Sequence, residues 1–135
     1  GVVVHDAARP LVTAQQVDAL IDALAGADGA IAASPVVDTL KRGDDESMIA
    51  ATVERAGLWR AETPQCFHAE IVRAAFGSAT DEELDTATDC SSMVEEAGGR
   101  VRLVPSASMN IKVTSPADLE LAADVLRAAG RLLAE

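Results

Sequence analysis

The stretch Gly1-Val2-Val3-Val4-His5-Asp6-Ala7-Ala8-Arg9-Pro10 decides the fold of this chain. Three β-branched residues in a row, with no polar residue between them, are typical of a strand buried on both faces in a parallel sheet. The strand is predicted to end at His5, and Thr13 then opens a helix with a capping-box pattern. Ligands of open α/β sheets bind beyond the carboxyl ends of the strands, so Asp6 and Arg9 are expected to lie where the chemistry is done.

Apolar periodicity predicts that strands and helices alternate along the rest of the chain. Strands are expected over residues 30–33, 57–62, 101–104 and 110–113, and helices over 14–25, 68–76, 90–97 and from 116 onward. A turn at 63–65 should end the strand before it, the acidic segment 78–85 should be a solvated loop, and the closing helix should cover the sheet. The pattern implies an α/β fold, a Rossmann-like and mostly parallel sheet with flanking helices, in a single domain over residues 1–135.

Residues 36–54 interrupt this alternation. Their mixed polar and apolar pattern predicts two strands around a polar turn at residues 43–47. Because a two-stranded ribbon is marginally stable by itself, this protruding β-arm should lean on something outside its own domain. An ordinary surface hairpin is the alternative.

Composition excludes several classes of protein. Apolar residues make up 49% of the 135 residues and aromatic residues 2%, which suits an α/β core. No apolar run approaches the roughly 20 residues of a membrane span, and the N-terminus lacks the basic region of a secretory signal, so a cytoplasmic location is expected. The spacing of the two Cys and two His residues predicts neither a zinc site nor a disulfide framework.

The charge of the chain narrows the search for a functional site. A net charge of −11 argues against nucleic acid or an anionic membrane as a partner. With eleven Lys and Arg residues, any phosphate site must be built from a few of them. Four cations have a structural explanation. They lie on the solvent-exposed face of an expected strand or near a helix C-terminus, and they are Arg100, Arg102, Arg127 and Arg131. Arg9, Arg55 and Lys112 remain as candidates.

The opening loop allows a functional and a structural interpretation of each polar residue. Asp6 could hold a divalent cation or a ligand hydroxyl, or it could form an Asx turn. Arg9 offers a planar fork that matches phosphate, or it could form a surface salt bridge. His5 is interpreted as structural, because no carboxylate or second histidine is spaced to make it a general base.

Five motifs give the chain a specific resemblance. They are V-V-V-H-D-A-A-R-P at 2–10, D-T-L-K-R at 38–42, T-V-E-R-A-G-L-W-R-A-E-T-P-Q at 52–65, T-D at 88–89 and N-I-K-V-T at 110–114. In this order they resemble the 2-C-methyl-D-erythritol 4-phosphate cytidylyltransferases. In that family a glycine-rich nucleotide loop with its own Arg and Lys precedes the first motif. The chain therefore resembles the C-terminal part of such an enzyme, a nucleotidyltransferase-like fold that is incomplete at the N-terminus.

The resemblance implies a homodimeric cytidylyltransferase that joins CTP and 2-C-methyl-D-erythritol 4-phosphate, with Mg²⁺ accompanying the nucleotide and no metal held by a protein cluster. The acceptor site would be formed by Asp6, Arg9, Thr63, Thr88 and Lys112. Thr39 and Arg55 would enter this site from the arm of the neighbouring subunit. Ala7 and Lys112 would border the nucleotide. Without the resemblance, isolated threonines in strands and caps are usually structural.

Two alternatives remain open from the sequence. A pentitol-phosphate cytidylyltransferase, acting on ribitol 5-phosphate, shares the opening loop and the terminal motif. A non-catalytic binding or dimerisation module is favoured by the missing glycine-rich loop. Against this second alternative, nucleotidyl transfer asks mainly for alignment and fixed positive charge, so scattered Arg, Lys and Thr residues at strand ends suit it.

Overall fold

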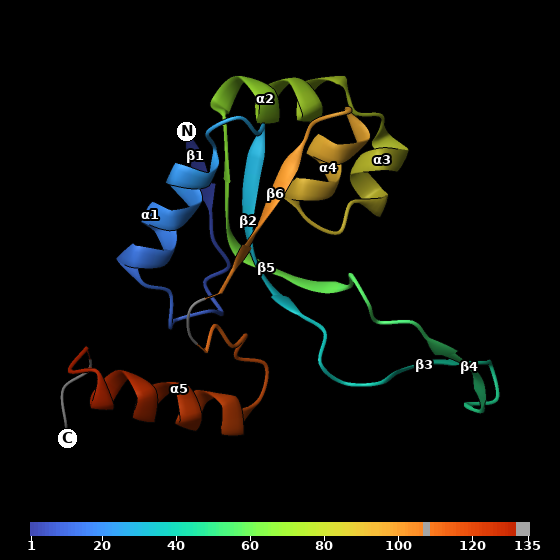
Figure 1. Ribbon diagram of the computed structural model, residues 1–135, viewed down its shortest axis with the longest axis vertical. Helices are drawn as coiled ribbons and strands as arrows, with labels where there is room; N and C mark the ends of the chain where they lie inside the picture. The colour runs from blue at the N-terminus through green and yellow to red at the C-terminus, as the bar shows by residue number, and fades with distance from the viewer. Residues whose placement is uncertain (107–108, 132–135) are drawn as a thin grey trace.

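A four-stranded sheet forms the centre of the computed structural model, which describes residues 1–106 and 109–131 (Figure 1). The strands, in spatial order, are β1 (Val2–Val4), β5 (Trp59–Phe67), β2 (Gly29–Pro35) and β6 (Val101–Pro105). β2 and β6 pair in parallel, and β5 runs antiparallel to both of its neighbours. Strands β1, β2 and β6 therefore share one direction, which makes the sheet mostly parallel in orientation, as the sequence predicts.

The first strand differs from its prediction. Val2 and Val3 are 37% and 42% exposed, because β1 pairs with β5 alone among the described strands and lies at an edge of the sheet. The central position belongs to β2, where the small residues of 30–33 are almost completely buried. The run of valines correctly indicates a strand, but it does not reveal which strand is covered on both faces.

Strand β5 also differs from its prediction, because it continues through Thr63-Pro64-Gln65 to Phe67 and does not end in a turn. The Thr63–Pro64 peptide bond is cis. Gln65 pairs with Ile31 and Ala61 pairs with Ala33, so residues 62–64 of β5 face one residue of β2. This irregularity turns the side chains of Glu62 and Thr63 out of the regular ladder, as bulges near functional sites do.

Two apolar clusters, one on each face of the sheet, hold the helices. Helix α1 (Ala14–Ala23) contributes Leu20 and is followed by Leu24, and both pack against β2 and β5. Helices α2 (Ala69–Ser78) and α4 (Cys90–Glu96) pack on Ile31 and Phe67. Because neighbouring strand residues point to opposite faces, these clusters give the helix–sheet–helix layers of an α/β fold.

Three further expectations need correction. Part of the expected loop at 78–85 forms helix α3 (Asp81–Thr86), because Thr80 and Glu83 make a complete capping box. The expected strand at 110–113 is absent, and Val113 N instead donates to Ala8 O.

Helix α5 (Pro116–Ala128) begins at its predicted N-cap, Ser115, but lies beyond the ends of the strands and not across the sheet (Figure 1). Its predicted core residue Leu119 is 61% exposed.

Residues 36–54 form a ribbon that projects from the sheet (Figure 1). Strands β3 (Leu40–Gly43) and β4 (Ile49–Val53) pair with each other in a separate two-stranded sheet. Asp44 closes the turn by accepting hydrogen bonds from the backbone N–H groups of Glu46 and Met48. Met48 and Ile49 are 63% and 68% exposed, so the tip of the ribbon presents apolar side chains to its surroundings.

None of the helices among the described residues is long and apolar enough to cross a bilayer.

Candidate active site

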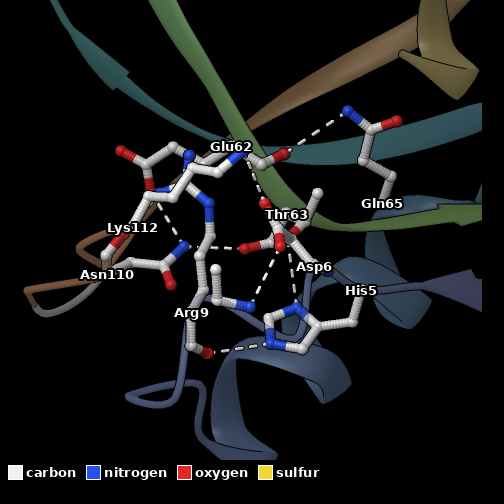
Figure 2. Close-up of polar contacts among 9 residues, drawn as sticks. His5, Asp6, Arg9, Glu62, Thr63, Gln65, Asn110 and Lys112 are labelled. Carbon is white, nitrogen blue, oxygen red and sulfur yellow. Dashed lines mark hydrogen bonds and ion pairs between the residues drawn. The ribbon is translucent and has the colours of Figure 1, made fainter. Parts of the chain in front are cut away.

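Asp6 is the centre of the loop that follows β1, and each of its polar atoms has a different partner (Figure 2). Its Oδ1 accepts a hydrogen bond of 3.0 Å from Ala8 N, its Oδ2 lies 3.0 Å from Lys112 Nζ, and its backbone N donates to Thr63 Oγ1 at 2.9 Å. The Asx-turn and ligand-site interpretations are therefore compatible. The hydrogen bond from Ala8, followed by that from Lys112, lowers the pKa of Asp6 below its ordinary value. The carboxylate thus stays ionised beside the Lys112 ammonium.

Arg9 reaches from the same loop to the segment before α5. Its Nη1 donates to the carbonyl oxygen of Asn110 over 2.6 Å. The Arg9 carbonyl lies 2.9 Å from His5 Nε2, and His5 Nδ1 lies 3.2 Å from Thr63 Oγ1. Since a carbonyl oxygen only accepts, Nε2 is the donor in the first of these contacts, and in that tautomer Nδ1 can accept from the Thr63 hydroxyl. His5 therefore supports the loop, in agreement with its structural interpretation.

Glu62 and Asn110 were not predicted as site residues, yet they connect the segments that form the site. Glu62 is 8% exposed, and its carboxylate accepts hydrogen bonds from Ser34 Oγ, from Ser106 Oγ at 2.7 Å and from Asn110 Nδ2 at 2.9 Å. Burial by itself raises the pKa of Glu62, but the three hydrogen bonds and the nearby charge of Arg9 outweigh it and lower the pKa. A glutamate at the end of an expected strand, directly before Thr63-Pro64, was the available signal.

A cavity of about 650 Å³ lies beside this network, at the carboxyl ends of β2 and β6. Its walls combine the cations Arg9, Arg60 and Lys112 with the carboxylates Glu62 and Asp118. Asp6 and Thr63 do not line the cavity, but Asp6 holds Lys112 at its wall and the carbonyl of Thr63 accepts from Asn110 Nδ2 at 2.8 Å. Cations on one wall can bind a phosphate group, and the recessed position lowers the competition from water.

Thr63 and the motif at 88–89 are linked through Gln65. Gln65 Nε2 donates to Asp89 Oδ2 over 2.7 Å, and its Oε1 accepts from Ser91 N. Burial raises the pKa of Asp89, but the hydrogen bond from Gln65, followed by those from the serines of α4, lowers it overall. The start of α4 is thereby fixed relative to β5.

Three predicted site residues lie apart from this group. Thr39 and Arg55 belong to the arm, where Arg55 Nη1 donates to Val37 O. Thr88 is exposed before α4, and neither it nor the two arm residues line the cavity. Ala7 is exposed in the loop between Asp6 and Ala8. Within one subunit the structure therefore gathers Asp6, Arg9, Thr63 and Lys112 and leaves the others outside.

The described residues contain no group of three or more His, Cys, Asp or Glu side chains that could hold a metal ion. At the site, the carboxylate of Asp6 pairs with Lys112, that of Glu62 accepts three hydrogen bonds, and that of Asp118 accepts from Thr114 and Ser115. This donor set suits a hard cation that is held mainly by substrate phosphates and water, as Mg²⁺ commonly is.

Together, the mostly parallel sheet, the arm and the cations beyond the strand ends define a protein of the nucleotidyltransferase-like α/β class. The family model described as 2-C-methyl-D-erythritol 4-phosphate cytidylyltransferase matches residues 1–128. The chain belongs to this family.

Relatives and solved structures agree with this assignment. The chain is 49% identical over 129 residues to the 2-C-methyl-D-erythritol 4-phosphate cytidylyltransferase of Rubrobacter xylanophilus, covering 95% of this chain and 55% of that protein. It is 48% identical over 126 residues to the enzyme of the same name from an Azoarcus species, covering 93% and 51%. The chain thus spans about half the length of these relatives.

The crystal structure of the Thermus thermophilus 2-C-methyl-D-erythritol 4-phosphate cytidylyltransferase superposes with a TM-score of 0.81 at 33% identity, covering 93% of this chain and 61% of that one. The Francisella tularensis enzyme of the same name gives a TM-score of 0.79 at 28% identity, with coverages of 96% and 58%. The fold described above is therefore shared with solved members of the family.

Proposed function

We propose that the complete protein carrying this chain transfers CMP from CTP to 2-C-methyl-D-erythritol 4-phosphate in non-mevalonate isoprenoid synthesis. An oxygen of the acceptor phosphate forms a bond to the α-phosphorus of CTP. The bond from that phosphorus to the bridging oxygen breaks, and pyrophosphate leaves with the electron pair. The products are 4-diphosphocytidyl-2-C-methyl-D-erythritol and pyrophosphate.

The observation that carries this proposal is the convergence of Asp6, Arg9, Thr63 and Lys112, which come from three distant segments, beside one cavity. Such a reaction needs reactants held in line and developing negative charge met by fixed cations. Lys112 supplies an ammonium whose side chain is 53% exposed and can meet a phosphate, and Asp6 holds that ammonium in place. Arg9 supplies a guanidinium on the adjoining wall.

A homodimer completes the proposed acceptor site. Thr39 and Arg55 are too firmly part of the projecting arm to serve the cavity of their own subunit, so we place them in the site of a second subunit. The exposed apolar side chains at the tip of the ribbon support this arrangement, because an isolated two-stranded ribbon is marginally stable. Ala7 and Lys112 would border the nucleotide in the same site.

Mg²⁺ would accompany CTP, held mainly by the triphosphate and water, with the carboxylate of Asp6 as a further oxygen donor. When bound, the ion would neutralise part of the charge on the phosphates. Because the reaction consumes CTP, we propose that the enzyme works in the cytoplasm.

The test is a pyrophosphate-release assay on the complete gene product with CTP, Mg²⁺ and 2-C-methyl-D-erythritol 4-phosphate. We expect turnover with this acceptor and at least a tenfold lower kcat/KM with ribitol 5-phosphate, because buried polar groups shaped for one polyol are left unpaired by another. Preferred turnover of ribitol 5-phosphate would assign the protein to the pentitol-phosphate reaction. No turnover with either acceptor would overturn the proposal.

A further inference from the structure

We propose that Asn110, held by Glu62, is a positioning residue that sets Arg9 and Lys112 at the wall of the cavity. The inference rests on the proposed function for its kinetic consequences. Asn110 lines the cavity with Arg9 and Lys112, but its amide nitrogen and its backbone carbonyl are directed at protein partners (Figure 2). It therefore acts on the substrate through the two cations.

The orientation of the Asn110 amide is set by two acceptors. Its Nδ2 donates to Glu62 Oε2 at 2.9 Å and to the Thr63 carbonyl at 2.8 Å, which uses both hydrogens of the amide. Turning the amide over would place Oδ1 against these two oxygens. Asn110 Oδ1 is buried and has no hydrogen-bond partner within the part of the chain that the structure describes. The carboxylate of Glu62 and the carbonyl of Thr63 thus fix the orientation of the Asn110 side-chain amide.

The backbone of Asn110 transmits this geometry to the two cations. Its carbonyl accepts the 2.6 Å hydrogen bond from Arg9 Nη1, which orients the guanidinium. Two residues later, Lys112 Nζ pairs with Asp6, and Val113 N donates to Ala8 O at 2.7 Å. The segment that carries Lys112 belongs to no strand, so these contacts replace the ladder that would otherwise hold it.

Glu62 is suited to hold Asn110 because its carboxylate only accepts. Its Oε1 accepts from Ser34 and its Oε2 from Ser106 and Asn110, which come from the end of β2, the end of β6 and the segment before α5. The charged groups around this network are Arg9 in the loop, Arg60 on β5 behind Ser34, the Asp6–Lys112 pair, and Asp118 on α5 across the cavity. The three hydrogen bonds, together with the nearby charge of Arg9, lower the pKa of Glu62 and favour its ionised form.

An exchange of amide and carboxylate between the two positions tests this arrangement in the complete enzyme. In Asn110→Asp two carboxylates face each other, so we expect kcat/KM for the acceptor to fall about 100-fold at neutral pH. Because the pair can share a proton, the activity of Asn110→Asp relative to wild type should rise as the pH is lowered.

In Glu62→Gln the new amide oxygen can still accept from Asn110, but the new amide nitrogen replaces the oxygen that accepts from Ser34, so we expect kcat/KM to fall by less than it does in Asn110→Asp. In the double variant Glu62→Gln/Asn110→Asp, the amide introduced at position 62 can donate to the carboxylate introduced at position 110. We expect the kcat/KM of this double variant to be at least about tenfold higher than that of Asn110→Asp. Gln15→Glu, which adds the same charge on an exposed surface of α1, is the matched control and should behave as wild type.

A second measurement does not depend on the reaction. Acylation of Lys112 by an amine-reactive ester, followed by peptide mass spectrometry, should be several-fold faster in Asn110→Asp than in wild type, because the ammonium leaves Asp6. If the wild-type enzyme shows no transferase activity, the proposed function fails, and the labelling comparison still decides the positioning role.

The inference is overturned if Asn110→Asp keeps wild-type kinetics and labelling, or if the double variant is no better than Asn110→Asp. Should Asn110→Asp fail to fold, the double variant is expected to restore folding, as judged by circular dichroism. Failure of that rescue would equally overturn it.

Discussion

Lys112 Nζ lies 3.0 Å from Asp6 Oδ2, so the segment before the last helix is tied to the loop after the first strand. The Lys112 side chain is 53% exposed and the Asp6 side chain 29%, which leaves the ammonium open to a phosphate. The ion pair therefore holds a cation in place before any substrate binds. Such preorganisation lowers the cost of assembling the charge that the reaction requires.

We predict that Arg55 and Lys112 serve the same acceptor phosphate from different subunits. Arg55→Ala and Lys112→Ala should each lower kcat by about 10²- to 10³-fold in the complete enzyme, by analogy with lost transition-state donors. Mixing the two inactive variants should restore activity, because each heterodimer contains one site with both cations. Steady-state assays after subunit exchange provide the measurement.

The control for this experiment is Arg127→Ala, which removes an exposed ion pair with Asp124 and should leave kcat unchanged. Exchange between subunits is followed separately by mass spectrometry of mixed dimers. If subunits exchange and no activity returns, the two cations act within one subunit.

We predict that the arm is required for dimerisation. Deleting Lys41 to Ala50 and closing the gap with a short turn removes most of β3 and the tip that carries Met48 and Ile49. The variant should sediment as a monomer with an unchanged melting transition of the core, because the ribbon pairs only with itself among the described strands. A deletion variant with the association constant of the wild type would refute the dimer proposed here.

We predict that a polypeptide of these 135 residues binds CTP weakly by itself. Its net charge of −11 repels an anion, and the resembled family binds the triphosphate through backbone N–H groups of a loop that precedes this segment. Calorimetry with CTP and Mg²⁺ should give a dissociation constant above about 1 mM, equivalent to less than about 4 kcal/mol of binding free energy. Micromolar affinity would mean that the nucleotide site lies within these residues.

We predict that Asp89 contributes to stability above its titration range and that acid removes this contribution. Its pKa is lowered in the folded protein, so the contribution is fully present above the unfolded-state pKa of about 4 and is lost as the pH falls through the folded-state pKa. Asp89→Ala removes the N-cap of α4 and should cost about 1 kcal/mol or more of unfolding free energy at neutral pH.

Asp89→Asn is the matched variant, since it keeps a capping oxygen but does not titrate. Urea unfolding across the acid range should show a flatter pH dependence for Asp89→Asn than for wild type. Parallel profiles for the two proteins would show that Asp89 is not responsible for the acid sensitivity.

Local signals in the sequence predict the starts of α1, α4 and α5 correctly, whereas the segment that contains α3 was expected to be a loop. Thr13 caps α1, Asp89 caps α4, and Ser115 with Pro116 and Asp118 begins α5. In each case the capping side chain bonds to a backbone group three residues away. A pattern that spans three or four residues is complete within the sequence, so it can be read without knowledge of the fold.

The placement of the strands was decided by the tertiary structure. Val2 and Val3 form a strand as predicted, but pairing with β5 on one side leaves them at the edge. Residues 63–65 carry the composition of a turn, yet pairing with both β1 and β2 extends β5 past them to Phe67. Strand propensity depends on neighbouring strands and on burial, which a single segment does not specify.

The residues of the candidate site were likewise found partly from the sequence and partly only from the structure. Asp6, Arg9 and Lys112 were identified from the sequence, because single cations and acids at strand ends stand out in an acidic chain. Glu62 and Asn110 were not, although they connect the strand ends to the segment of Lys112. Their hydrogen bond joins residues 48 positions apart, and Glu62 makes it from the irregular stretch of β5. Sequence determined which side chains could bind phosphate, and the long-range register of the sheet decided which of them meet.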